Sequence, residues 1–286
     1  MNNIEEIKEQ NQFDCFIKMY AYIAGALLEN GKRGEQTVRE ALIRYGEDRG
    51  HRLRTLHIEI GIKTNLKALC QAENCCGEDP RFYRKSVKDM EEVQLWEVYS
   101  CPMVHMWRTL EAQKAGMLFC EEVVHAIVRA YTCGKGQANL SDRMTCERDT
   151  FCRFSLYYRS ANLDEEQRNR SFGEGGQAPV MPSYDINENF IKLYYFLLSS
   201  AKDIMGQEGI RAVAAGLKRL AEDLVRALKK EASHVDRLLD EKFMRDFFPL
   251  QLDMEKEVLW EQYSAHDAEK LLRVNLMRTL YHELNL

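Results

Sequence analysis

Two cysteines, Cys146 and Cys152, lie at the ends of the short segment CERDTFC, and a third, Cys120, lies in an apolar stretch before it. A thiolate can bind a soft metal ion or attack an electrophilic carbon, whereas a protonated thiol packs like a small apolar side chain. The chain contains no CxxC pair, which is the usual signature of a cysteine-rich zinc site. Spacing alone therefore leaves a metal site, a nucleophile and plain core packing as alternatives.

Each of these three thiols is expected on an apolar face. If residues 111–131 form a helix, Cys120 falls within an apolar stripe that includes Ile127. Residues 139–146 and 151–158 alternate between apolar and polar side chains as strands do, so we expect a hairpin here. The three thiols would then point into one core between the helix and the sheet.

The hairpin also predicts how its two cysteines lie. If Glu147 pairs with Phe151, Cys146 and Cys152 stand directly opposite each other, with Cβ atoms about 4.5–5.5 Å apart. In a reducing compartment, cysteines are free, metal-bound or catalytic more often than they form a disulfide framework. We therefore expect these side chains to be thiols.

Two other groupings could carry acid–base chemistry. His105 follows Cys101 by four residues, so the two are neighbours if the chain turns helical after Pro102. Cys101 and Pro102 could equally do no more than end a strand. Glu121 and His125 are also four residues apart, which suits a proton-transfer pair as well as a solvated pair on a helix surface.

The composition excludes some classes of function. The chain has 286 residues, 45% of them hydrophobic and 30% charged, which is enough to bury a core. Its net charge of −5 argues against nucleic-acid binding, which depends on basic surfaces. The N-terminus is polar and acidic, and no apolar run reaches the length of a membrane span. We therefore expect a cytoplasmic protein with no nucleic-acid or membrane partner.

Periodicity along the chain predicts an α+β fold. Helical spacing of apolar residues recurs in residues 3–30, from about residue 34 and in 111–131, whereas residues 91–100 alternate like a strand that Pro102 terminates. The prediction is a set of N-terminal helices with a small antiparallel sheet, followed by an all-helical C-terminal module.

The domain boundaries follow from a change in composition. Residues 161–188 contain prolines, glycines and scattered charges, which is typical of a linker or a long surface loop. We therefore predict an α+β domain in residues 1–160 and a helical domain in residues 189–286. The apolar stripes of the C-terminal helices must be buried, either within the chain or in a homo-oligomer.

The order of these motifs resembles the L-2-amino-thiazoline-4-carboxylic acid hydrolase family over roughly residues 15–160. The resemblance rests on a Cys-Pro pair after a strand (Cys101), a Phe-Cys pair on the next helix (Cys120) and the hairpin TCERDTFCRF. This hairpin also resembles that of 4-vinyl-reductase-type small-molecule-binding domains, in which cysteines of the helix and hairpin can hold zinc. Arg148 stands where the hydrolase pattern has a glycine before the aspartate.

The resemblance implies hydrolysis at the C=N bond of a small cyclic amidine-like carboxylic acid, such as a thiazoline. This chemistry needs a nucleophile, a proton donor and a cation for the carboxylate. The nucleophile would be a thiol or a water bound to zinc or another divalent metal, and no residue is assigned to the carboxylate. The candidates are Cys101, His105, Glu121, His125 and Asp149 as catalytic residues and Cys120, Cys146 and Cys152 as metal ligands. The competing hypothesis is a small-molecule-binding or sensing module in which the thiols hold a structural zinc and no bond is broken.

Overall fold

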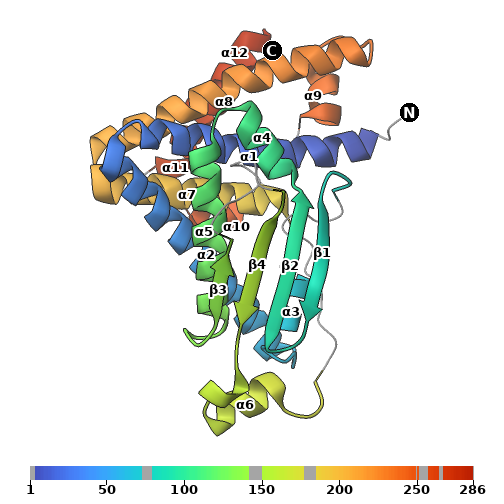
Figure 1. The fold of residues 1–286 in the computed structure, drawn as a ribbon. Helices are drawn as coiled ribbons and strands as arrows, with labels where there is room; N and C mark the ends of the chain where they lie inside the picture. The colour runs from blue at the N-terminus through green and yellow to red at the C-terminus, as the bar shows by residue number, and fades with distance from the viewer. Residues whose placement is uncertain are drawn as a thin grey trace. The chain divides into compact units, whose positions relative to one another are not determined.

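The computed structural model describes residues 4–72, 79–141, 150–176, 185–248, 250, 257–263 and 267–285. These residues form helices and one four-stranded antiparallel sheet (Figure 1), which confirms the predicted α+β class with a helical C-terminal part. Among them, no helix is long and apolar enough to cross a membrane. The chain divides into two compact units, which are described separately below.

The first unit comprises residues 1–41, 109–115 and 185–286, and its described part contains helices only. These are α1 (Ile4–Leu28), the first part of α2 (Gly31–Glu59), α7 (Ile186–Met205), α8 (Gln207–His234), α9 (Glu241–Phe247), α10 (Glu257–Gln262), α11 (Ala268–Leu272), the π-helical η5 (Arg273–Met277) and α12 (Arg278–Leu284).

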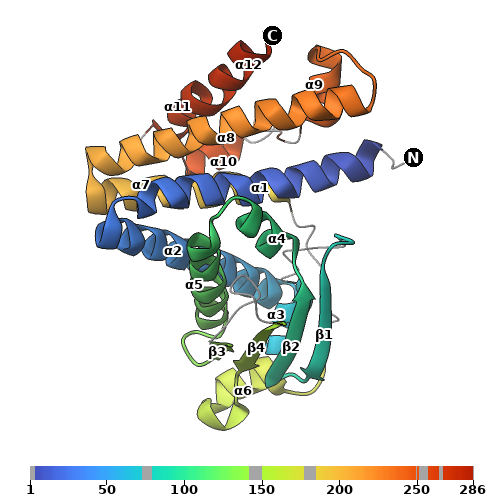
Figure 2. The ribbon, with the colours of Figure 1, turned by 45° about the horizontal axis from the view of Figure 1, so that its top comes forward.

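The long helices α1, α7 and α8 pack side by side within this unit (Figure 2). Their apolar faces are buried, as at Leu27 of α1 and Leu217 of α8. Gly216 of α8 lies so close to α1 that a Cβ atom there would be 2.6 Å from the Cα atom of Ile23. The apolar stripe predicted for α8 therefore has a partner, and that partner is the N-terminal helix.

This grouping differs from the division at residues 160 and 189 that the sequence suggests. The N-terminal helix α1 belongs to the same compact unit as the C-terminal helices. The physical reason is that an apolar stripe specifies burial without specifying a partner, so neighbours in sequence need not be neighbours in space. Within 161–188, residues Glu165–Phe172 form helix α6, which Asp164 caps by accepting a hydrogen bond of 2.8 Å from the Gln167 N–H.

The second unit comprises residues 42–108 and 116–184. It contains the rest of α2, α3 (Leu66–Ala72), β1 (Tyr83–Asp89), β2 (Val93–Ser100), α4 (Pro102–Thr109), most of α5 (Gln113–Tyr131), β3 (Gln137–Leu140), β4 (Cys152–Tyr157), η2 (Ser160–Asn162) and α6. The sheet order is β1-β2-β4-β3, so β1 and β3 are its edges. Strand β2 ends directly before Cys101, as the proline at 102 predicts.

Strands β3 and β4 form the predicted antiparallel pair, but in a different register. Pairing of residue 147 with residue 151 would place Leu140 opposite Tyr158, whereas Leu140 lies opposite Phe154. The two registers differ by four residues, an even number, and therefore present the same side chains to each face. Alternation could not distinguish between them. Cys146 itself lies outside the described residues.

Candidate functional site

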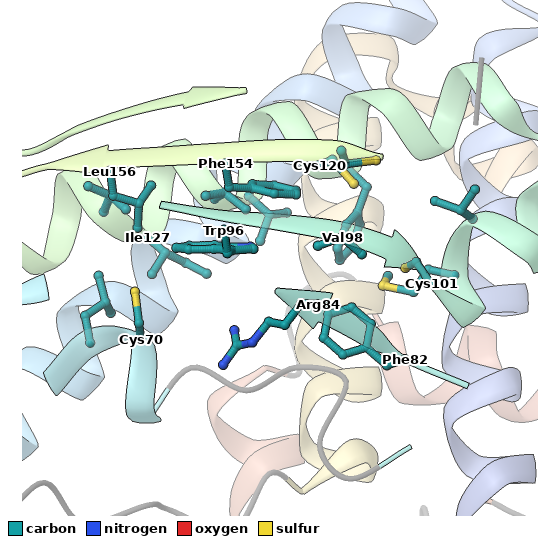
Figure 3. A pocket seen from close by; sticks show the side chains of 18 of the residues that line it. Cys70, Phe82, Arg84, Trp96, Val98, Cys101, Cys120, Ile127, Phe154 and Leu156 are labelled. Carbon is teal, nitrogen blue, oxygen red and sulfur yellow. The ribbon is translucent and has the colours of Figure 1, made fainter. Parts of the chain in front are cut away.

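A cavity of about 150 Å³ lies in the second unit between one face of the sheet and the helices that cover it (Figure 3). Strands β2 and β4 contribute every second residue, in keeping with the period of two in a strand, and α5 contributes residues at helical spacing. Its lining includes Trp96, Val98, Cys152, Phe154 and Leu156 from the sheet, Cys120, Val123, Val124 and Ile127 from α5, and Leu69 and Cys70 from α3.

Two glycines bring α2 and α5 into backbone contact behind this cavity. A Cβ atom at Gly46 would lie 2.8 Å from the carbonyl oxygen of Val123, and one at Gly50 would lie 2.5 Å from that of Ile127. Neither position has room for a side chain. Because the glycines are four residues apart, they lie on one face of α2 and hold α5 at the distance that leaves the cavity between α5 and the sheet.

Aromatic side chains form the wall of the cavity on the sheet side. Trp96 and Phe154 are opposite each other in the β2–β4 pair, and their rings stack with centroids 5.4 Å apart and planes 11° from parallel. The guanidinium of Arg84, from the edge strand β1, lies 5.9 Å from the centroid of the Trp96 ring. The two stacked rings and the guanidinium therefore stand beside one another on the cavity face of the sheet.

The cavity has two distinct ends. Cys152 pairs with Val98, so it lies at the same end as Cys101, and Figure 3 shows Cys120 and Cys101 at this end. Cys70 lies at the opposite end, beside Ile127 and Leu156 in Figure 3. The seven residues from Cys120 to Ile127 correspond to about 10 Å along a helix. The cavity is therefore elongated, and of the thiols in the described ranges that line it, three lie at one end and one at the other.

Of the four predicted catalytic residues that the structure describes, one lines this cavity. Cys101 does so, at the junction of β2 and α4, where its carbonyl oxygen accepts a 3.1 Å hydrogen bond from the His105 N–H. The expected helical turn after Pro102 is therefore present, but the side chain of His105 is exposed. His125 is also exposed and Glu121 is half-buried, and neither lines the cavity. Asp149 lies outside the described residues.

The predicted metal ligands are only partly described. Cys120 and Cys152 both line the cavity, from the helix and hairpin faces on which the sequence placed them, whereas Cys146 is not described. Within the described ranges, no three cysteine, histidine or acidic residues are grouped closely enough to hold a metal ion. A zinc or other divalent ion bound by these thiols remains a prediction.

Sequence reasoning missed the cationic side chains of the site. Arg84 and Arg49 both line the cavity, and either could face a carboxylate. Arg49 is 8% exposed, and its Nη1 donates a 3.1 Å hydrogen bond to the Tyr45 hydroxyl oxygen. The signal for Arg84 was weak, because the segment YRKSVKD is so polar that it does not stand out as a strand. Its alternation, with Arg84 and Ser86 on one face, was the only usable clue.

A buried polar network lies in the same unit as the cavity. The Tyr131 hydroxyl oxygen lies 2.6 Å from Nδ1 of His57, and neither side chain is exposed. Burial lowers the pKa of His57 and raises the pKa of Tyr131. The tyrosine therefore keeps its proton, the imidazole is neutral, and the two groups share one hydrogen bond. This pair is a structural hydrogen bond rather than a source of charge.

Comparisons of the chain with protein-family models, with curated proteins and with solved structures find no match. The described residues define the class of protein by themselves. It is an α+β protein whose second unit encloses a small, elongated and largely apolar cavity, lined by aromatic rings and thiols and flanked by arginines.

Proposed function

We propose that the second unit binds a small, mainly apolar compound that contains a flat ring. The observation that supports this most strongly is the stacked pair of Trp96 and Phe154 on the wall of the cavity. Aromatic rings prefer offset-stacked or edge-to-face neighbours, and ligand cavities are typically apolar with a few polar groups that set orientation. The arginines and thiols around the aromatic wall are such groups.

Hydrolysis of a ring at its C=N bond is a second candidate, favoured by the position of Cys101. This residue lines the cavity directly before the N-terminus of α4, and the N-terminus of a helix stabilises a negative charge. Sγ of Cys101 would add to the carbon of the C=N bond, and the ring C–S bond at that carbon would break, with the departing ring sulfur taking a proton. Water would then replace Sγ at the same carbon, which restores the Cys101 thiol and releases the opened carbamoyl product. Of the predicted proton donors, neither His105 nor His125 lines the cavity.

Calorimetric titration with flat ring compounds, such as indole and 2-aminothiazoline-4-carboxylate, would test the binding proposal. Trp96→Leu should weaken binding about fivefold, since an aromatic contact contributes on the order of 1 kcal/mol beyond area burial. Cys133→Ser is the matched control, because Cys133 is exposed and outside the cavity. Equal binding by wild type and Trp96→Leu would reject this site.

Mass spectrometry of the same mixtures would decide between binding and hydrolysis. Under the hydrolase candidate, wild type converts a ring acid, Cys101→Ser still binds it without converting it, and Cys133→Ser behaves like wild type. If wild type binds these rings without converting any of them, hydrolysis is rejected and binding is the remaining function. Measurement of zinc per chain in wild type and Cys120→Ser would test the predicted role of the thiols as metal ligands.

A further inference from the structure

A second, polar cavity adjoins the apolar one. Three residues line both of them: Cys70, Arg84 and Trp96. The polar cavity, of about 270 Å³, is completed by Lys67, Gln71, Ser86, Asp89 and Gln94. The side chain of Arg84 is therefore shared between an apolar space on one side and a polar space on the other.

Cations outnumber acids at this boundary. Asp89 is already engaged, since Nε2 of Gln94 donates to it at 2.8 Å and Nζ of Lys67 lies 3.7 Å from it. Across the described ranges, no carboxylate is paired with Arg84, whose recorded contact is the one with the Trp96 ring. Among the described residues that line the polar cavity there are thus two cations, Lys67 and Arg84, and one carboxylate, Asp89, so the positive charge of Arg84 is available for an anionic ligand.

The geometry of β1 explains why Arg84 points to this boundary. Arg84 pairs with Val98 and Ser86 pairs with Trp96, so both face the cavity side of the sheet. A bulge follows between Ser86 and Lys88, after which Asp89 pairs with Gln94. Bulges redirect side chains, and here the shift brings Asp89 to the rim of the polar cavity. Because β1 is an exposed edge strand, Arg84 can bind an anion that stays in contact with solvent, which avoids the cost of burying a charge.

Arg84 also defines a direction along the apolar cavity. In Figure 3 its guanidinium lies toward Cys70 and away from Cys101 and Cys120. The apolar space between these ends is about 10 Å long, because Cys120 and Ile127, which line it, are two helical turns apart. A single five-membered ring whose carboxylate is bound to Arg84 would leave the thiol end empty.

We propose that the ligand is an elongated amphipathic monocarboxylic acid. Arg84 binds its carboxylate at the polar cavity, and its arylalkyl body, which contains the flat ring, extends along the Trp96–Phe154 wall toward the thiol end. This inference rests on the proposed binding function and adds the charge, length and direction of the ligand. The fork of a guanidinium matches both oxygens of a carboxylate, which is why arginine suits this role better than lysine.

The test is a calorimetric comparison of two acids, octanoate and 4-phenylbutyrate, with their neutral amides. Wild type should bind each acid about two- to fivefold more tightly than its amide, because Arg84 is exposed and solvent screens its interaction with the carboxylate. Arg84→Gln should lose this preference while binding the amides unchanged, and Arg84→Lys should recover part of it. Lys85→Gln is the matched control, because it removes one positive charge at the next position of the same exposed strand, on the opposite face.

The outcomes distinguish failure of this inference from failure of the proposed binding function. Equal affinity of wild type for acid and amide, or equal losses in Arg84→Gln and Lys85→Gln, would overturn recognition of the carboxylate and leave apolar binding intact. Benzoate binding as tightly as 4-phenylbutyrate would overturn the elongated shape. Failure of every acid and amide to bind would contradict the binding function itself. Binding of octanoate as tightly as 4-phenylbutyrate would contradict the flat ring that the proposed function requires.

Discussion

Nδ1 of His57 and the hydroxyl oxygen of Tyr131 lie 2.6 Å apart, in a part of the second unit where neither side chain is exposed. Burial lowers the pKa of His57, so the folded protein holds this imidazole neutral. In the unfolded chain the same histidine takes up a proton near pH 6.5. The unfolded state therefore binds more protons below that pH, and the free energy of unfolding should decrease as the pH falls from about 7 to 5.

This pH dependence can be assigned by substitution. His57→Gln should flatten the decrease, whereas His51→Gln, on an exposed position of the same helix, should keep it. A single histidine changes the stability by at most about 1.4 kcal/mol per pH unit. Urea unfolding at several pH values measures the slope, and identical slopes for wild type and His57→Gln would show that another group is responsible.

The glycines between α2 and α5 provide a second prediction, for stability. Gly46→Ala and Gly50→Ala should each destabilise the protein by roughly 1–3 kcal/mol, because the added methyl groups collide with the backbone of α5. Gly25→Ala in α1 is the control, since its Cβ meets nothing within 4 Å. There the helix propensity of alanine should stabilise by up to about 1 kcal/mol. Chemical unfolding measures all three, and a stabilised Gly46→Ala would contradict the close approach of the helices.

The cysteines are expected to differ sharply in reactivity. Cys15 is fully buried in α1, and burial raises the pKa of its thiol, so both access and thiolate formation are suppressed. Cys133 is exposed. Iodoacetamide should label Cys133 within the first minutes and Cys15 only after unfolding, as peptide mass spectrometry would report. Early labelling of Cys15 in the native protein would contradict the packing of α1.

Two ion pairs link the same helices in the first unit and should differ in strength. Lys18 and Asp223 are 2.7 Å apart and only 16% and 17% exposed, whereas Glu29, directly after α1, and Arg219 are 60% and 46% exposed. Double-mutant cycles with Lys18→Met and Asp223→Asn should give a coupling of about 1–3 kcal/mol. The cycle with Glu29→Gln and Arg219→Gln should give about 0.2–1 kcal/mol, because solvent screens that pair. A coupling at the exposed pair equal to or above that at Lys18–Asp223 would refute this ranking.

Local patterns were sufficient to predict the class of fold and the faces of several candidate residues. Helical spacing placed Cys120 on an apolar stripe of α5, and alternation placed Cys152 on the inner face of β4. The strand that ends before Cys101 was also predicted, because a proline at 102 cannot continue a ladder. These features depend on the backbone period and on side-chain chemistry over a few residues, which is information that a single segment contains.

The register of the hairpin and the strand β1 were not predictable in the same way. A shift of four residues leaves the inner and outer faces of a strand unchanged, so alternation permits both registers. Strand β1 is polar because it is an exposed edge, and charged edges are common since they discourage pairing with other chains. The sequence around Arg84 therefore resembles an ordinary solvated surface segment, and its alternation alone did not identify it as part of the site.

The sequence by itself determined the helical or extended character of segments with clear apolar periodicity, such as 111–131 and 151–158, and which of their faces are apolar, because these properties follow from short-range geometry. Only the tertiary structure decided which apolar faces meet. It paired α1 with α8, brought α2 against α5 at two glycines, and placed Arg84 and Cys101 on the same cavity. Burial of apolar surface favours contact without selecting a partner, so the selection depends on shape complementarity between segments that are distant in the chain.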